Sequence, residues 1–362
     1  GMMHGLAIVA TERAGQFGFR LLAGGGLGHK PRQAIVLEEW LPEADLLPAM
    51  EAVITVHHTY SDRSKRAKSR IKFLVERFGA EGFREKYQTA FKRTAAAFSG
   101  KASPQGEWAL PGVQDSGLSG APRAVFEQKQ VGYWAVPLAI PLGTLQLKAL
   151  KQLIAIMQRF QLENLRTTQD QNLVLTDVPA AQRDELIEAL NEAGFSLPKP
   201  GDDVVACPGT STCRLGITSS MTLAGLLDGG PNDLRIRVSG CHNGCAQPET
   251  GEIGVYGEGK RYFGRLIPHY RLYLGGDGRR GGALAVRGPT IPSARIVTAV
   301  ERVKEDWKSS SAPDFSAWAQ AQGGDWFVSR LADLRRVEET DLDELSSDHG
   351  ETNSFKVLQL GG

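Results

Sequence analysis

The sequence is poor in cysteine and in aromatic residues. Its 362 residues include four cysteines, all between positions 207 and 245, and only 7% are aromatic. So few cysteines in so long a chain exclude a small fold that is held together by disulfides. At about 150 residues per domain, the length instead predicts two to three domains, each large enough to bury a core.

The sequence also lacks an excess of charge of either sign and lacks a long apolar run. Lysine and arginine total 42 against 41 aspartate and glutamate, which gives a formal net charge of +1. This balance argues against nucleic acid or a membrane surface as a partner. The longest apolar stretch, residues 133–143, is shorter than the roughly 20 residues of a membrane helix. The N-terminus has no basic segment or cleavage site typical of a secretory signal, so a cytoplasmic location is expected.

Apolar spacing and turn residues predict an α+β fold. The first part, residues 1–98, is expected to hold two strands within 6–23 and helices over 42–56, 62–78 and 81–93. Residues 99–123 are rich in Gly, Pro and Ser, which is typical of a linker.

Two further units are predicted after the linker. Residues 124–200 are expected to form a compact unit with a strand at 133–140, helices at 145–160 and 180–193, and a strand pair near 165–178. Residues 201–310 hold the cysteines, three more strands and a closing helix from Pro292. The remainder, residues 311–362, contains an acidic run that is predicted to be a solvated arm.

A weak internal repeat supports this division. The segments FRLLAGGGLG and LPAMEAVITV resemble YRLYLGGDGR and ARIVTAVERV, and each pair predicts a strand, a glycine turn and a helix. The repeat indicates a duplicated unit whose second copy spans about residues 120–305. Residues 1–98 would then be the C-terminal remainder of a first copy.

All four cysteines lie in two short motifs, CPGTSTC and CHNGC, with the spacings C-x5-C and C-x3-C. Two disulfides could form, but a cytosolic chain has little use for them, and clustered cysteines more often mark a metal site. Zinc sites usually close each half with C-x2-C, whose tight turn brings both thiolates to one ion. The longer spacings favour an iron–sulfur cluster, which is wider than one ion, over zinc ligands or free thiols.

Three arginines have the spacing of one helical face. Arg63, Arg66 and Arg70 recur at i, i+3 and i+7 inside the predicted helix over 62–78. Such a face suits a polyanion, because arginine binds carboxylates in bidentate geometry. The alternatives are a solvated basic face and a nucleic-acid contact, and no basic excess elsewhere supports the second.

The cysteine motifs carry a resemblance to a known family. CPGTSTC together with CHNGC, the latter inside IRVSGCHNGCAQPETGEIGVYG, resembles the motifs of the sulfite and nitrite reductase hemoproteins. The resemblance extends to FRLLAGGGLG, SDRSKRAKSRIKFLVERFG and LRTTQDQNLVL, and so covers most of residues 5–305. It implies the pseudo-duplicated fold of that family, with mixed sheets, flanking helices and a ferredoxin-like half domain over residues 124–200.

The resemblance also implies two cofactors, siroheme and a four-iron four-sulfur (4Fe-4S) cluster. The cluster ligands that it implies are Cys207, Cys213, Cys241 and Cys245. In that family the last of these cysteines also bridges to the siroheme iron, which is the role expected for Cys245. The residues expected to contact the siroheme carboxylates are Arg63, Arg66, Arg70, Gln171 and Asn172. Asn243 is expected to support the turn between the last two cysteines.

In the full-length family, the substrate anion is held by basic residues that come largely from the first half. Those positions are expected to lie upstream of this chain, so no catalytic residue is assigned within it. The chain is accordingly expected to be an inactive C-terminal part of a reductase that takes sulfite to sulfide with six electrons. The alternatives are a ferredoxin-type nitrite reductase, a precorrin-3B synthase-like protein of the cobalamin pathway, and a non-catalytic module that binds only a cluster.

Partners follow from the same resemblance. The electron donor is expected to be a ferredoxin or a flavoprotein reductase subunit, and a neutral chain selects neither. If half of a pseudo-symmetric protein is missing, an apolar surface is left uncovered, so self-association of this chain is also expected.

Overall fold

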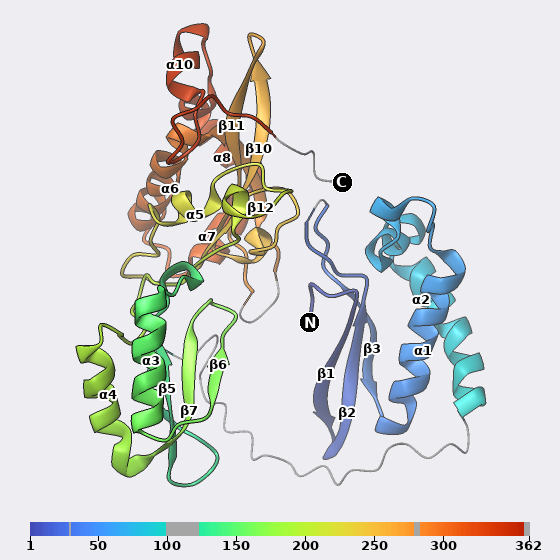
Figure 1. The fold of residues 1–362 in the computed structure, drawn as a ribbon. Helices are drawn as coiled ribbons and strands as arrows, with labels where there is room; N and C mark the ends of the chain where they lie inside the picture. Colours follow the sequence, from blue (N-terminus) through green and yellow to red (C-terminus); the bar gives the residue numbers. More distant parts are fainter. Residues whose placement is uncertain (29, 99–122, 279–282, 358–362) are drawn as a thin grey trace. The chain divides into compact units, whose positions relative to one another are not determined.

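The computed structural model describes residues 1–28, 30–98, 123–278 and 283–357 (Figure 1). The chain divides into two compact units, the first built mainly from residues before 99 and the second mainly from residues after 122. Each unit has its own sheets and its own hydrophobic core. Within the described ranges, no helix is both long enough and apolar enough to cross a membrane.

The first unit is a three-stranded antiparallel sheet that packs against two helices. The strands β1 (Leu6–Arg13), β2 (Gln16–Ala23) and β3 (Ile35–Leu41) pair in that order, followed by α1 (Glu43–Tyr60) and α2 (Ile71–Phe98). Alternate residues of β2 and β3, such as Leu21 and Leu37, face Val53 of α1 and Phe83 of α2 in one core. The two strands predicted within residues 6–23 are confirmed, whereas β3 was not predicted.

The helix predicted over residues 62–78 is wrong in its first half. Residues 61–70 form a loop with one short turn, η1 (Arg66–Lys68), and α2 begins only at Ile71. Side chains compete here for the backbone groups that a helix would use: Ser61 Oγ donates to the carbonyl oxygen of Ser69 at 2.7 Å. Ser64 N–H likewise donates to Asp62 Oδ1 at 3.2 Å. Such local bonds favour turns over helix interiors.

The second unit begins with a four-stranded antiparallel sheet in the order β4-β5-β7-β6. Its elements are β4 (Phe126–Glu127), β5 (Tyr133–Leu138), η2 (Pro141–Gly143), α3 (Leu147–Arg159), β6 (Leu165–Thr167), β7 (Leu173–Pro179), η3 (Ala180–Gln182) and α4 (Arg183–Glu192). Leu153 of α3 and Leu186 of α4 pack with Leu175 of β7 in one core. The helices and longer strands predicted for this part are confirmed to within a few residues.

The rest of the second unit is built on a five-stranded mixed sheet in the order β12-β11-β10-β9-β8. β8 (Val204–Ala206), β9 (Ile236–Ser239) and β10 (Ile253–Tyr262) are parallel, and β11 (Arg265–Leu274) and β12 (Val286–Pro292) continue antiparallel. The connections include η4 (Gly209–Ser211), α5 (Ser220–Ala224), η5 (Pro248–Thr250), η6 (Ser293–Arg295) and α6 (Ile296–Ser310). Of these strands, β8 and β12 were not predicted.

The prediction that the acidic run, residues 337–351, is a solvated arm is wrong. The described residues 311–357 form α7 (Phe315–Gln322), α8 (Gly324–Arg330), α9 (Ala332–Arg335), η7 (Glu339–Asp341) and α10 (Leu342–Leu345). Phe315, Trp318 and Phe327 are buried in the core of the five-stranded sheet. Even the acidic run contributes Leu342 and Leu345, which pack on Ile267 of β11. Most of its charged residues are exposed, but Asp348 is buried, and the apolar residues of its short helices point inward, so composition alone is misleading here.

The predicted repeat has a structural counterpart. In the first unit an antiparallel meander β1-β2-β3 leads into α1, and in the second the meander β10-β11-β12 leads into α6. Each repeat thus contains three strands, two more than the sequence comparison indicates. The segment predicted as a linker, 99–123, lies outside the described residues except for Arg123.

Candidate cofactor site

Two neighbouring parallel strands carry the cysteine motifs to the same edge of the sheet. Cys207 follows β8 directly, and Cys241 follows β9 after one residue. β8 and β9 pair in parallel with Ala206 opposite Val238, so both loops leave the sheet at its carboxyl edge. The N–H of Cys207 donates to the carbonyl oxygen of Val238 at 3.0 Å, which continues the pairing into the first motif. In open sheets this edge is where ligands usually bind.

Two glycines let the cysteine loops approach each other closely. Gly209 has φ +53°, and a Cβ placed there would lie 2.3 Å from Ser220 Oγ. A Cβ on Gly240 would lie 2.6 Å from the Cα of Gly209 itself. Because real side chains never approach so closely, both positions require glycine.

The four thiols differ in exposure but interact with one another. Cys241 is buried at 5% exposure, Cys207 is half-buried, and Cys213 and Cys245 are exposed. Burial raises the pKa of Cys241, the backbone N–H of Asn243 opposes this, and the thiols of the other three cysteines raise it further. Burial and then the thiols of Cys207 and Cys213 raise the pKa of Cys245 in the same way. Four mutually repelling thiols therefore converge at this edge of the sheet.

The donor set fits an iron–sulfur cluster. Four cysteine thiolates are the usual ligands of a 4Fe-4S cluster. The N–H of Gly240 already donates to Cys207 Sγ at 3.1 Å, as expected where a charged sulfur must be stabilised. Among the described residues, no group of three His, Cys, Asp or Glu side chains is arranged to hold a single metal ion. The four cysteines thus have the donor chemistry that a cluster needs, and β8 and β9 carry their two motifs to the same edge of the sheet.

Asn243 lies between the last two cysteines and is exposed. Its backbone N–H, rather than its side chain, bonds the thiol of Cys241. The turn is closed by two further backbone bonds, from Gly244 N–H to the carbonyl oxygen of Cys241 at 3.2 Å and from Gln247 N–H to that of Gly244 at 2.8 Å.

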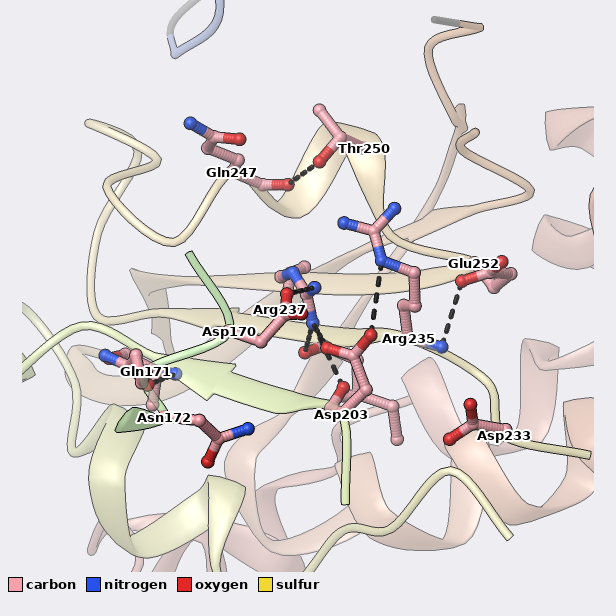
Figure 2. Close-up of polar contacts among 12 residues, drawn as sticks. Asp170, Gln171, Asn172, Asp203, Asp233, Arg235, Arg237, Gln247, Thr250 and Glu252 are labelled. Carbon is pink, nitrogen blue, oxygen red and sulfur yellow. Dashed lines mark hydrogen bonds and ion pairs between the residues drawn. The ribbon is translucent and has the colours of Figure 1, made fainter. Parts of the chain in front are cut away.

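Gln171 and Asn172 lie at the tip between β6 and β7 and make protein contacts (Figure 2). Gln171 Nε2 donates to the carbonyl oxygen of Ala206 at 2.7 Å, and its Oε1 accepts from the N–H of Ala206 at 3.0 Å. Asn172 Oδ1 accepts from the N–H of Ile140 at 2.8 Å. The two Gln171 bonds tie the four-stranded sheet to β8, which ends directly before Cys207. Contact of either residue with siroheme stays a prediction.

A buried ionic cluster lies next to this tip and was not predicted from the sequence (Figure 2). Asp203, at 3% side-chain exposure, lies 2.6 Å from Arg237 and 3.4 Å from Arg235, while Arg237 reaches Asp170 at 3.1 Å. Burial raises the pKa of Asp203, but Arg237, then Arg235 and Arg123, outweigh this, so the pKa lies below its ordinary value. The only sequence signal was the alternation of Arg235 and Arg237 with apolar residues along a strand.

The prediction that Arg63, Arg66 and Arg70 share one helical face is wrong. All three precede α2, in the loop and short turn after α1, because serine and aspartate side chains cap the backbone there. Arg70 Nη1 donates to the carbonyl oxygen of Leu27 at 3.1 Å, beside the buried Lys72, whose Nζ donates to the same oxygen at 3.1 Å. These residues belong to the first unit. Their contact with siroheme carboxylates stays a prediction that no helical alignment now supports.

Comparison with known proteins identifies related sequences in both units. The profile described as "Nitrite and sulphite reductase 4Fe-4S domain" matches residues 2–94, and that of the "Nitrite/Sulfite reductase ferredoxin-like half domain" matches residues 126–193. The four cysteines lie outside both matched segments, so their assignment as ligands stays a prediction.

Individual relatives agree with the profiles. The chain is 28% identical over 293 residues to the chloroplastic ferredoxin–nitrite reductase of Arabidopsis thaliana, covering 76% of this chain and 47% of that protein. It is also 28% identical over 298 residues to the ferredoxin sulfite reductase of Synechococcus elongatus, covering 75% of this chain and 44% of that protein. The chain therefore spans about half the length of the curated relatives it matches.

A solved structure shows the same fold. The NirA protein of Mycobacterium tuberculosis matches with a TM-score of 0.69 and 23% identity over 90% of this chain and 61% of that one. The description of the first profile names a 4Fe-4S cluster. The segments matched in the two units are thus similar to domains of the nitrite and sulfite reductases.

Proposed function

We propose that this chain carries the cluster-binding part of a siroheme-dependent reductase that converts sulfite to sulfide. The observation that supports this most directly is the convergence of Cys207, Cys213, Cys241 and Cys245 at the carboxyl edge of β8 and β9. The activity is proposed for the whole protein, since the chain spans only about half of its curated relatives.

In this proposal the four thiolates would hold the cluster, and the exposed Cys245 would also be the ligand shared with siroheme. When bound, the two cofactors would supply electrons one at a time to a reduction that needs six of them. The chain holds the sulfurs in place and stabilises their charge, through the Gly240 N–H on Cys207 and the Asn243 N–H on Cys241. Buried Cys241 also keeps water from one corner of the site.

Nitrite is the second candidate substrate, because it is the substrate that the names of several relatives give. Several of the matched proteins are ferredoxin–nitrite reductases, whereas others are sulfite reductases. The proposed electron donor is a ferredoxin, which most of these names include, with a flavoprotein reductase subunit as the alternative.

The test is the anaerobic absorption spectrum of the purified chain with its iron, acid-labile sulfide and siroheme content. A siroheme band together with cluster absorbance supports the proposal, and turnover of sulfite and nitrite with a chemical electron donor then selects the substrate. Cluster without siroheme, even after siroheme is supplied, would instead indicate a module for electron transfer. Failure to take up either cofactor in reconstitution would contradict the assignment of the four cysteines.

A further inference from the structure

The C-terminal acidic segment, residues 337–351, reaches back to the cysteine site through Asp348. This carboxylate is 7% exposed, and its Oδ2 accepts from the N–H of Ser219 at 2.6 Å. Its Oδ1 accepts from Ser293 Oγ and from the N–H of His349, the latter at 2.9 Å. A carboxylate this deeply buried is costly unless hydrogen bonds replace its water, and three donors do so here.

The residues on either side of Ser219 hold the first cysteine loop. Ser220 Oγ donates to the carbonyl oxygen of Cys207 at 2.7 Å and lies 3.5 Å from its Sγ. Thr218 N–H donates to the carbonyl oxygen of Gly240 at 2.9 Å, and Gly240 N–H in turn donates to Cys207 Sγ. The position of residues 218–220 therefore sets both the place of Cys207 and the hydrogen bond to its sulfur.

The segment that carries Asp348 is anchored to β11 and to the start of α6. Arg295, which precedes α6, pairs with Asp341 at 3.0 Å, and Arg265 of β11 pairs with Asp343. Leu342 and Leu345 pack on Ile267 of β11. The anchored segment thus presents the carboxylate of Asp348 to residues 218–220.

We propose that Asp348 is a positioning residue for the cluster, acting through Ser219 and Ser220 on Cys207. The inference rests on the proposed function, because it takes Cys207 to be a cluster ligand. Loss of the carboxylate frees residues 218–220, which loosens Cys207 and weakens the Gly240 bond to its sulfur. Since hydrogen bonds to the sulfurs raise cluster potentials, the potential becomes more negative.

The test compares the reconstituted chain with Asp348→Asn and with the control Glu344→Gln, which removes an exposed carboxylate from the same segment. In Asp348→Asn we expect about tenfold faster loss of iron to a ferrous chelator and a more negative midpoint potential of the cluster. Glu344→Gln is expected to match the original chain in both. A correctly folded Asp348→Asn variant with unchanged release rate and potential would overturn the inference.

Two further measurements keep the outcome decisive. If circular dichroism shows that Asp348→Asn does not fold, Ser220→Ala is tested instead, because it breaks the same link next to Cys207. It is expected to lower the cluster potential likewise, and an unchanged potential overturns the inference.

If the original chain binds no cluster, the proposed function fails instead. The cofactor-free chain then tests the positioning by itself: alkylation of Cys207 by iodoacetamide is expected to be severalfold faster in Asp348→Asn, and an equal rate overturns the inference.

Discussion

The side-chain amide of Gln171 pairs with both backbone groups of Ala206, donating at 2.7 Å and accepting at 3.0 Å. It thereby acts as an extra strand residue alongside β8, immediately before Cys207. The tip between β6 and β7 is thus fixed to the strand that presents the first cysteine motif.

Replacing Gln171 by alanine is expected to lower the free energy of unfolding by about 1–3 kcal/mol, because two backbone groups lose their partner. The measurement is urea unfolding followed by tryptophan fluorescence. Gln158→Ala, at an exposed position of α3, is the control and is expected to change the free energy by less than about 0.5 kcal/mol. Equal effects of the two variants would contradict a structural role of the Gln171 amide.

Asp203→Asn is expected to destabilise the second unit by about 3–5 kcal/mol, because it leaves Arg237 buried without its closest carboxylate. The matched control is Asp184→Asn, which removes a surface pair with Arg183 at 2.7 Å and 78% exposure of the aspartate. Such an exposed pair contributes at most about 1 kcal/mol. A loss of similar size in both variants, measured by urea unfolding, would refute the burial argument.

The same carboxylate predicts a pH dependence of stability. Its pKa is lowered in the folded chain, so the unfolded chain binds the proton first as the pH falls. The stabilisation is therefore complete above the unfolded value of about 3.9 and is lost below it, as the pH approaches the folded value. Unfolding experiments between neutral pH and pH 3 are expected to show a steeper loss for the original chain than for Asp203→Asn. Equal losses of stability with falling pH in the two chains would contradict this role of the Asp203 carboxylate.

Phe327→Ala is expected to lower the free energy of unfolding by about 3–5 kcal/mol, because this fully buried ring joins α8 to the core of the five-stranded sheet. Phe263→Ala is the matched control, since the Phe263 side chain is 60% exposed. Thermal unfolding measures both. A stable, folded chain truncated after residue 310 would show that α7 to α10 are dispensable after all.

Cys245→Ser is expected to abolish the magnetic coupling between siroheme and cluster in the fully loaded protein, since Cys245 is the proposed bridge. Electron paramagnetic resonance and Mössbauer spectra of the variant and the original protein provide the comparison. Coupling of unchanged strength in Cys245→Ser would assign the bridge to another residue.

Much of the fold follows from local pattern. The strands within residues 6–23 and the helices α3, α4 and α6 have clear apolar periodicity, and their positions agree with prediction. The strand β8, only three residues long, and β12, which includes two prolines, carry too little periodicity to be found. The helix predicted before Ile71 failed because serine and aspartate side chains bind the backbone there, which an apolar pattern does not register.

The sequence by itself determined the chemistry of this protein: four cysteines at C-x5-C and C-x3-C spacing, between glycines, in motifs that resemble one family. Only the tertiary structure decided how that chemistry is held. The parallel pairing of β8 with β9, the amide of Gln171 on Ala206, and Asp348 on Ser219 are contacts between residues far apart in the chain. The spacing within each motif is local, so the sequence alone shows which thiols lie near one another. The carboxylate of Asp348 accepts a hydrogen bond from Ser219, 129 residues away in the chain, and only folding brings the two together.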